Sequence, residues 1–226
     1  VMGTLALLTD FGLRDWYVGA MKGVISAIDP GLAVVDITHD IPTGAVTAAG
    51  FVLSQCWGDF PDGSVFCCVV DPGVGTDRMP VAVRQARTGK IFVGPDNGLV
   101  SFVARHEDAR SVQPKANGFE ARRLVNNAYF RELPSHTFHG RDIFAPVAAR
   151  LAAGLPFEKV GPVALRLVAT RWPEVSRTEA GIAVTAVHID HFGNVITNVT
   201  DHYLLAHGLK SRPLTVAVSE ARLPVP

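Results

Sequence analysis

The sequence predicts an α/β protein, in which a largely parallel sheet with helices on both faces is followed by a smaller β-rich domain. Short apolar runs alternate with helical patterns over residues 1–155, which is typical of a parallel sheet. The run Val65–Val70 is uniformly apolar, as expected of a strand covered on both faces. Hydrophobic residues make up 48% of the 226 residues and charged residues 19%, which favours a large core over disorder.

The first domain, predicted at residues 1–155, begins with strand and helix in alternation. The first helix has apolar residues at helical spacing, and Pro30 marks its end. Gly154 and Pro156 mark the end of the last helix. Thr88-Gly89 predicts the turn of a hairpin. The predicted elements are Leu5–Thr9, Asp15–Ile28, Leu32–Ile37, Val46–Trp57, Val65–Val70, the hairpin Val81–Ala86 with Lys90–Val93, Gly98–His106 and Ile143–Leu151.

The remainder of the chain has a different pattern. Residues 156–180 contain three prolines and scattered charges, so we interpret them as a linker or crossover. Residues 181–226 are interpreted as a smaller β-rich domain. Its predicted elements are the strands Ile182–Ile189, Val195–Val199 and Leu214–Val218 and a short helix, Tyr203–His207.

The charge balance is neutral, with 21 Lys and Arg against 21 Asp and Glu. It therefore predicts neither nucleic acid nor an anionic membrane as the main partner, and a small-molecule pocket is the better expectation. The uncharged run Ile41–Gly58 reaches membrane length. Pro42, Gly44 and several polar residues within it favour a turn followed by a buried helix over a membrane span.

The three cysteines, Cys56, Cys67 and Cys68, are odd in number and show no CxxC spacing. We interpret them as reduced thiols, and no signal-like stretch is seen at the start of the sequence, so we expect a cytoplasmic protein. None of the cysteines has an obvious activating neighbour, so thiol chemistry is not expected.

Polar side chains follow several of the predicted strands. Asp10, Asp71, and Asp96 with Asn97 stand at strand ends. Sheets of this class bind ligands beyond the carboxyl ends of their strands. Any one of these acids could instead cap a turn or a helix, but several together favour a functional edge.

The segment from Asp71 to Arg78 is the first candidate site. A strand delivers Asp71, Gly73 and Gly75 permit a tight turn, and Arg78 returns to the same space. The segment is not a phosphate-binding loop of the Walker type, because no Gly-Lys-Ser/Thr follows. The alternative is a plain turn with a surface ion pair.

Two further segments carry candidate residues. His139, in Thr137–Asp142, lies in a loop before an apolar helix, and we predict that Asp142 is the N-cap of that helix. A helix N-terminus would disfavour a protonated His139. The segment Ile189–Asn194 is either a simple hairpin turn or, through its Asp, aromatic and Asn side chains, part of a pocket for a polar ring.

A catalytic metal is not favoured. His39, Asp40, His139 and His191 are possible ligands, but no HxH or HExxH pair occurs. There is also no GxSxG nucleophile elbow.

Six segments in order resemble one family, the S-adenosyl-L-methionine (SAM) hydroxide adenosyltransferases, which are related to the SAM-dependent fluorinase and chlorinase. The similarity extends from about residue 4 to residue 200. The segments are Leu8–Gly12 with Asp15, Asp36–Pro42, Asp71–Arg78, Gly94–Leu99, Thr137–Asp142, and Asp190–Asn194 with Asn198.

The resemblance implies hydrolysis of SAM to adenosine and methionine without a metal or other cofactor. It also implies an N-terminal α/β domain, a C-terminal β-barrel-like domain, and a homotrimer that binds SAM between the N-domain of one subunit and the C-domain of its neighbour. The family's polar set around the water matches Asp71, Arg78 and His139. The substrate-binding positions that match are Asp10 for the ribose, Asp15 near the methionine part, Phe138 beside the adenosine, and Asp190, Phe192 and Asn194 on the C-domain side.

Hydroxide is preferred over halide as the nucleophile. The halogenases that resemble this chain have a tyrosine where Asp71 stands and lack the Arg and His partners, and a carboxylate would repel a halide. The fluorinase also carries a long insertion before the strand that leads into the Gly94–Leu99 segment, where this chain turns directly. The division of roles among Asp71, Arg78 and His139 stays open at this stage.

Family members usually continue beyond the position of Pro226 with further strands, including an Asn-Ser-containing segment that contacts the adenine. We therefore expect the second domain, as it stands in this sequence, to be incomplete. The competing hypotheses are a SAM- or adenosine-binding module without turnover, a metal-dependent hydrolase and, less favoured, a SAM-dependent halogenase.

Overall fold

The computed structural model describes residues 3–107, 118–170, 173–179 and 181–209. Its contacts divide the chain into two compact units, Val1–Thr170 and Arg171–Pro226. The division falls inside the segment 156–180 that was predicted to link two domains, and the exact boundaries at 155 and 180 stay predictions. Each unit is described by itself below.

The first unit is built on one six-stranded sheet of order β2-β1-β3-β5-β4-β6. Strands β2, β1, β3 and β5 are parallel neighbours, and β4 is antiparallel to both β5 and β6. The predicted mostly parallel sheet and the β4–β5 hairpin are therefore confirmed. The strands are β1 (Thr4–Thr9), β2 (Ala33–Thr38), β3 (Val65–Val69), β4 (Pro80–Gln85), β5 (Ile91–Pro95) and β6 (Phe119–Arg123).

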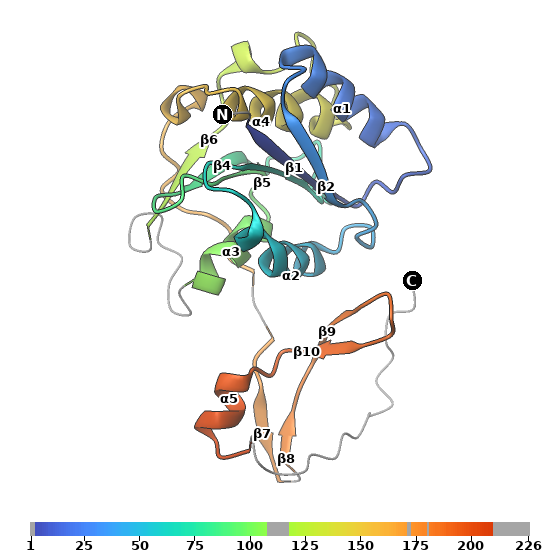
Figure 1. The fold of residues 1–226 in the computed structure, drawn as a ribbon, viewed down its shortest axis with the longest axis vertical. Coiled ribbons are helices and arrows are strands. Elements are labelled where there is room, and N and C mark those ends of the chain that lie inside the picture. Colours follow the sequence, from blue (N-terminus) through green and yellow to red (C-terminus); the bar gives the residue numbers. More distant parts are fainter. Residues whose placement is uncertain (1–2, 108–117, 171–172, 180, 210–226) are drawn as a thin grey trace. The chain divides into compact units, whose positions relative to one another are not determined.

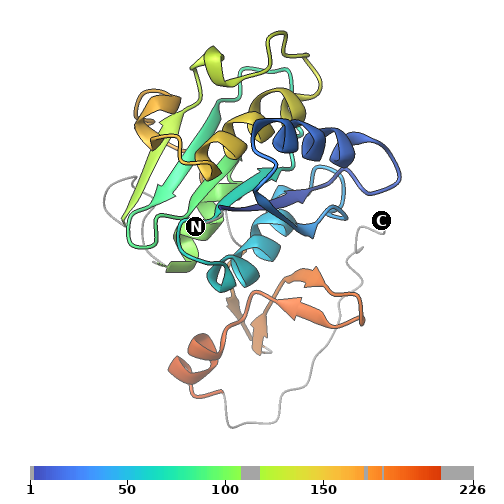
Figure 2. The same cartoon turned by 45° about the horizontal axis from the view of Figure 1, so that its top comes forward.

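Helices cover both faces of this sheet, as predicted. Figures 1 and 2 show α1 and α4 over one face and α2 and α3 over the other. Alternate residues of the central strands supply the two apolar layers, so Leu5 and Leu7 pack toward α1 and α4 while Ala6 and Leu8 pack toward α2 and α3. The helices are α1 (Tyr17–Ile28), α2 (Val46–Cys56), α3 (Leu99–Glu107) and α4 (Ala145–Ala152).

Three details of the first unit differ from the prediction. Helix α1 begins at Tyr17, two residues later than predicted. Strand β6 was not predicted, since the sequence Phe119–Arg123 carries three charged residues in five and becomes a strand only by pairing with β4. The segment Phe157–Val160, predicted to lie in a linker, forms a 3₁₀ turn with both terminal side chains buried against the first core cluster.

The carboxyl ends of the parallel strands lie along one edge of the sheet, because parallel neighbours end in the same direction. Asp10 follows β1, Asp71 comes just after β3, and Asp96 with Asn97 follows β5. The side-chain amide of Asn97 donates to the Val70 carbonyl across 2.7 Å. The predicted polar residues therefore stand at neighbouring strand ends.

The described part of the second unit consists of two antiparallel strand pairs and a short helix. These are β7 (Ser176–Thr178) with β8 (Gly181–Ala183), β9 (Ala186–Ile189) with β10 (Val195–Thr197), and α5 (Asp201–Ala206). The single strand predicted at 182–189 is thus split into β8 and β9. The predicted strand Leu214–Val218 lies outside the described residues.

Helix α5 begins where Thr200 caps it, with the threonine hydroxyl accepting the Tyr203 N–H across 3.1 Å. None of the helices in the described parts of the chain is long and apolar enough to cross a membrane.

Candidate active site

The loop from Asp71 to Arg78 folds back on itself through a series of short-range hydrogen bonds. The Val74 N–H donates to the Asp71 carbonyl across 3.2 Å, and the Thr76 N–H and hydroxyl both donate to the Gly73 carbonyl, at 3.1 and 2.7 Å. Gly75 has a φ of +78°, and a Cβ there would lie 2.9 Å from the His136 carbonyl oxygen. A glycine is therefore required at this position for the turn to return Arg78 toward Asp71.

Arg78 and Asp71 form a buried ion pair. The Arg78 Nε lies 3.0 and 2.9 Å from the two carboxylate oxygens, and Nη2 also donates to Oδ2. The side chains are only 9% and 5% exposed, so the pair is largely removed from water. The guanidinium also lies over the Phe144 ring, 5.1 Å from its centroid. The predicted surface alternative for this turn is therefore not what the structure shows.

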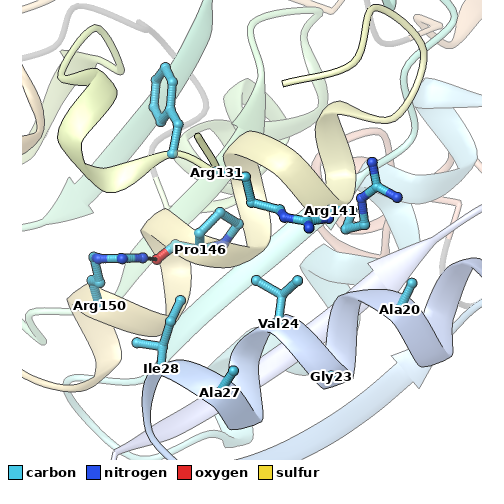
Figure 3. Close-up of a pocket in the computed structure, with 10 residues that line it drawn as sticks. Ala20, Gly23, Val24, Ala27, Ile28, Arg131, Arg141, Pro146 and Arg150 are labelled. Atoms are coloured by element: carbon cyan, nitrogen blue, oxygen red, sulfur yellow. Dashed lines mark hydrogen bonds between the residues drawn. The ribbon is translucent and has the colours of Figure 1, made fainter. Parts of the chain in front are cut away.

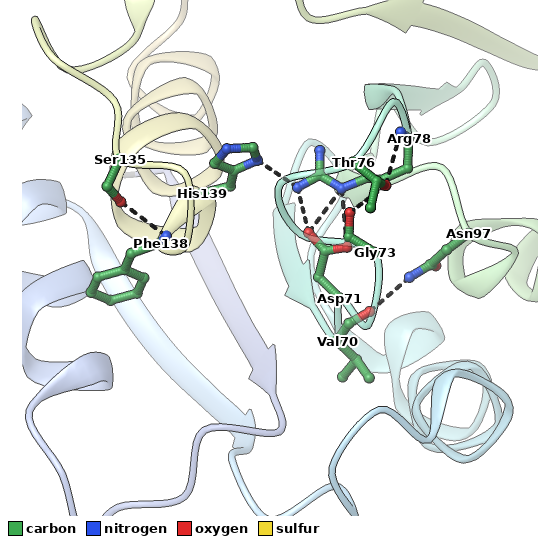
Figure 4. Close-up of polar contacts among 9 residues, drawn as sticks. All are labelled: Val70, Asp71, Gly73, Thr76, Arg78, Asn97, Ser135, Phe138 and His139. Carbon is green, nitrogen blue, oxygen red and sulfur yellow. Dashed lines mark hydrogen bonds and ion pairs between the residues drawn. The ribbon is translucent and has the colours of Figure 1, made fainter.

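His139 joins this pair from a distant part of the chain. Its Nδ1 lies 2.7 Å from Arg78 Nη2 (Figure 4). A guanidinium can only donate, so Nδ1 accepts and the ring proton sits on Nε2 in the neutral imidazole. Burial, and then the neighbouring Arg78 charge, lower the pKa of His139 below its ordinary value of 6.5. The three predicted residues are thus linked through Arg78, and the lowered pKa favours the neutral form of His139.

Asp142 is not the N-cap that was predicted. The chain is already helical at Gly140–Phe144, a π-helical turn that leads directly into α4, and Asp142 lies inside it. Its buried carboxylate instead accepts the Ser135 N–H at 2.8 Å and pairs with Arg141 at 2.7 Å. The Ser135 hydroxyl in turn accepts the Phe138 N–H at 3.0 Å (Figure 4). Asp142 therefore anchors the loop that carries Phe138 and His139.

Asp10 lies beside the Asp71 loop at the same edge of the sheet. Its Oδ2 accepts the Gly44 N–H across 2.8 Å. A Cβ on Gly44 would lie 3.6 Å from the Cβ of Pro72, which places the loop before α2 against the residue that follows Asp71. The segment before α2 was read from sequence only as a turn, so its contact with Asp10 is a feature that the pattern did not reveal.

Phe138 and Asp15 have contrasting surroundings. Phe138 is buried and makes edge-to-face contacts with Phe11 and Tyr17, at centroid distances of 5.9 and 5.1 Å. Asp15 is exposed, in the turn before α1. Phe138 therefore belongs to a packed aromatic group, while Asp15 is open to solvent in this structure.

The three predicted residues of the second unit lie in the turn between β9 and β10. The Asp190 carboxylate accepts the backbone N–H groups of Phe192 and Asn194, at 2.9 and 2.8 Å, and the Asn194 side-chain amide at 2.7 Å. The Asn194 side chain, and then these backbone donors, hold the pKa of Asp190 below its ordinary value. The Phe192 side chain is 86% exposed and its only described ring contact is with His191.

Among the residues that the structure describes, His, Cys, Asp and Glu side chains nowhere gather in threes with the spacing of a metal site. Burial raises the pKa of the Cys67 and Cys68 thiols, which disfavours the reactive thiolate at neutral pH.

A surface pocket of about 550 Å³ lies between α1 and the α4 region and contains none of the predicted site residues. Figure 3 shows three arginines, Arg131, Arg141 and Arg150, among the side chains that line it. Arg131 and Arg141 both pair with Asp142, and Arg150 donates to backbone carbonyls. Arg131 and Arg141 thus already support the loop before α4, and the lining of the pocket does not include Asp71, Arg78 or His139. Its lining residues are Ala20, Gly23, Val24, Ala27, Ile28, Phe130, Arg131, Arg141, Pro146 and Arg150.

The fold defines an α/β protein in which Asp71, Arg78 and His139 meet at the carboxyl edge of a mostly parallel sheet. A family model described as the SAM hydroxide adenosyltransferase N-terminal domain matches residues 5–161. The chain belongs to this family, so the resemblance drawn from the six sequence segments is confirmed.

Named relatives support the same assignment. The chain is 38% identical to an (R)-S-adenosyl-L-methionine hydrolase of Salinispora tropica, over 97% of this chain and 78% of the relative. It is 39% identical to a hydrolase of the same name from Thermus thermophilus, over 88% and 75%. A fluorinase of Nocardia brasiliensis is more distant, at 29% identity over 86% and 70%.

Solved structures contain the same fold. An uncharacterized conserved protein from Thermotoga maritima superposes with a TM-score of 0.80 at 38% identity, covering 90% of this chain and 74% of that one.

Proposed function

We propose that this protein hydrolyses SAM to adenosine and L-methionine by attack of an activated water at C5′. The observation that carries the proposal is the contact of His139 with the buried Asp71–Arg78 ion pair at the carboxyl edge of the sheet. Four relatives, at 31–40% identity, bear the name of a SAM hydrolase, which supports the choice of substrate and reaction.

The reaction requires help for the nucleophile more than for the leaving group. A bond forms between the water oxygen and C5′ while the C5′–S bond breaks, and its electron pair turns the sulfonium into the neutral thioether of methionine. No acid or metal is needed to assist that departure. Bulk water is a very weak acid and a poor nucleophile, so a proton acceptor and nearby positive charge favour the reaction.

The geometry supports a division of roles that the sequence left open. His139 already accepts a hydrogen bond from Arg78 at Nδ1, so its other nitrogen carries a proton and is a donor. The Asp71 carboxylate keeps acceptor capacity beyond its bonds to Arg78, because two oxygens offer about four lone-pair sites. We therefore assign Asp71 as the acceptor of the water proton, with Arg78 and His139 holding the water and stabilising its developing negative charge.

The same carboxylate supports water over halide as the nucleophile. A halide placed beside Asp71 would lie next to a negative charge that is only 5% exposed and thus weakly screened. The hydrolase relatives are also closer in sequence than the fluorinases, at up to 40% identity against 29%.

The remaining predicted residues are proposed to bind the substrate, with Asp10 at the ribose, Asp15 near the methionine part and Phe138 beside the adenosine. For the C-domain side we propose Asp190, Phe192 and Asn194, contributed by a neighbouring subunit of a homotrimer whose C-terminal domain is β-barrel-like. The Phe192 ring is available for such a contact, because its side chain is 86% exposed in the single chain.

The test is to incubate the purified protein with SAM, with and without EDTA and with added chloride, and to resolve the products. Equal amounts of adenosine and methionine, unchanged by EDTA, are expected. SAM binding without product would indicate a binding module, and loss of activity in EDTA would indicate a metal-dependent hydrolase. Formation of 5′-chloro-5′-deoxyadenosine would contradict the assignment of water as the nucleophile.

A further inference from the structure

A second histidine, His39, is buried at the same edge of the sheet and is not used in the mechanism above. It follows β2 and is 3% exposed. Its Nδ1 lies 2.8 Å from the hydroxyl of Thr9, the last residue of β1. Its Nε2 lies 3.1 Å from an Asp36 carboxylate oxygen, although the structure shows no well-formed hydrogen bond at that nitrogen.

The polar groups around His39 have compatible donor and acceptor roles. A carboxylate beside Nε2 favours the tautomer with its proton on Nε2, which leaves Nδ1 to accept from the Thr9 hydroxyl. The Thr9 oxygen keeps its acceptor capacity and receives the Phe11 N–H at 3.2 Å. The His39 side chain is thereby connected through one hydroxyl to the backbone just beyond Asp10.

The backbone of His39 contacts the other end of the same turn. Its carbonyl accepts the Gly12 N–H across 2.8 Å. The chain bends at Asp10 and Phe11, and Gly12 has a φ of +65°, a conformation that favours glycine. His39 thus contacts residue 9 with its ring and residue 12 with its carbonyl, while Gly44 donates to the Asp10 carboxylate between them.

A direct chemical role for this group is not supported. The order Thr9, His39, Asp36 is that of a hydroxyl nucleophile with its base and orienting acid. However, Thr9 and His39 are 0% and 3% exposed, so the hydroxyl and the ring are closed to a substrate. Thr9 and His39 therefore have a structural role. The segment that they contact is the turn that contains Asp10.

We propose that His39 is a positioning residue that sets the Asp10 turn for binding the ribose of the substrate, an inference that rests on the proposed role of Asp10. The ring and carbonyl of His39 hold the two ends of a four-residue turn. Loss of the ring leaves the Thr9 hydroxyl without its acceptor and lets the Asp10 carboxylate depart from the geometry needed for two ribose hydroxyls. The effect falls on substrate binding more than on the chemical step at Asp71.

The experiment is a double-mutant cycle on the full chain, with adenosine affinity measured by calorimetry and SAM turnover measured in parallel. His39→Ala is expected to weaken adenosine binding by about tenfold and to raise KM, with a much smaller change in kcat. In the Asp10→Asn background, the same change is expected to weaken binding by less than about twofold, because the positioned carboxylate is already altered. Equal effects in both backgrounds, or unchanged affinity, would overturn the proposal.

Two variants keep the test decisive if His39→Ala does not fold. Thr9→Val replaces the hydroxyl with a methyl group on a side chain that stays β-branched, and it is expected to reproduce the loss of adenosine affinity. His39→Asn retains a hydrogen-bond acceptor near the position of Nδ1, so its adenosine affinity should be higher than that of His39→Ala. Lys22→Met is the matched control, because Lys22 pairs with Asp36 at 2.6 Å on the exposed side and should leave affinity unchanged.

Adenosine binding does not require turnover, so the two proposals fail separately. A protein that binds adenosine through Asp10 and His39 but produces none from SAM would contradict the proposed function and leave this inference standing. Normal hydrolysis of SAM, with His39→Ala having the same effect on adenosine affinity in both backgrounds, would support the proposed function and contradict the positioning role of His39.

Discussion

The turns at Asp71–Arg78 and at Asp190–Asn194 look alike in sequence but differ in how their carboxylates are satisfied. Each begins with an aspartate and contains a glycine with positive φ, Gly75 in one and Gly193 in the other. Asp190 finds all its described partners within four residues and lies in an exposed turn. Asp71 is buried and pairs with Arg78, which then contacts His139 from 61 residues further on.

This difference supports the proposed chemical role of Asp71, whereas the contacts of Asp190 stabilise its own turn. A carboxylate that accepts neighbouring backbone N–H groups stabilises its own turn with little help from the rest of the protein. A buried carboxylate held by a guanidinium lies in a less polar environment, where charges act on a bound molecule with less screening. The contrast leads to four measurements, ordered from the largest expected effect to the smallest.

Asp71→Asn should remove most of the turnover while retaining SAM binding. The amide preserves the shape of the side chain but cannot accept the water proton at neutral pH, so kcat should fall by about 10²–10⁴-fold. Single-turnover assays with calorimetric binding of SAM test this. The matched change Asp190→Asn should leave the chemical step unchanged, and an Asp71→Asn enzyme with near-normal kcat would remove Asp71 from the mechanism.

Arg78→Met should destabilise the protein as well as inactivate it. The change leaves the Asp71 charge buried without its cation, and breaking such a pair typically lowers the free energy of unfolding by about 3–5 kcal/mol. Denaturant unfolding of the variant and of Asp71→Asn/Arg78→Met measures this. The double variant should recover part of the stability, since no uncompensated charge remains, and additive losses would argue against the pair as the cause.

His139 should give the enzyme an acid limb in its pH profile. Because burial and Arg78 lower the pKa of His139 below 6.5, the neutral ring that accepts from Arg78 persists until the pH falls below that value. An imidazole with a lowered folded pKa contributes its stability fully above the unfolded value of about 6.5 and loses it as the pH falls toward the folded pKa.

The measurement is the pH dependence of kcat/KM and of the unfolding midpoint, for the wild type and for His139→Asn. Both quantities should decline in the wild type below pH 6.5, and the part of the decline due to His139 should be absent from the variant. An unchanged acid limb in His139→Asn would assign that limb to another group.

Phe192→Ala should have the smallest effect on folding. The ring is 86% exposed, so its removal should leave the melting temperature of the protein nearly unchanged. Adenosine affinity and oligomeric state, by calorimetry and by light scattering, show whether the ring serves a site on a neighbouring subunit. Weaker adenosine binding at an unchanged melting temperature is the expected result, and a large drop in melting temperature would show that Phe192 has a structural role instead.

Much of the first unit could be predicted because its signals are local. The uniformly apolar run at 65–70 specifies a strand covered on both faces, and Thr88-Gly89 specifies the β4–β5 turn, where Gly89 has a φ of +68°. Strand β6 gave no such signal, because its charged residues do not form an apolar pattern. Its Glu120 side chain is paired with Arg122 and with Arg84 of the neighbouring strand, and these contacts exist only in the folded sheet.

The sequence by itself determined the mostly parallel sheet, the family and the identity of the three polar residues at the proposed reaction centre, because apolar periodicity and short ordered segments depend on near neighbours along the chain. The tertiary structure decided what those residues do to one another. It showed His139 Nδ1 within hydrogen-bond distance of Arg78, the use of Asp142 as a loop anchor in place of an N-cap, and the His39 contacts around Asp10. Each of these depends on burial and on partners that lie far apart in sequence or in an irregular helical turn, which no local pattern records.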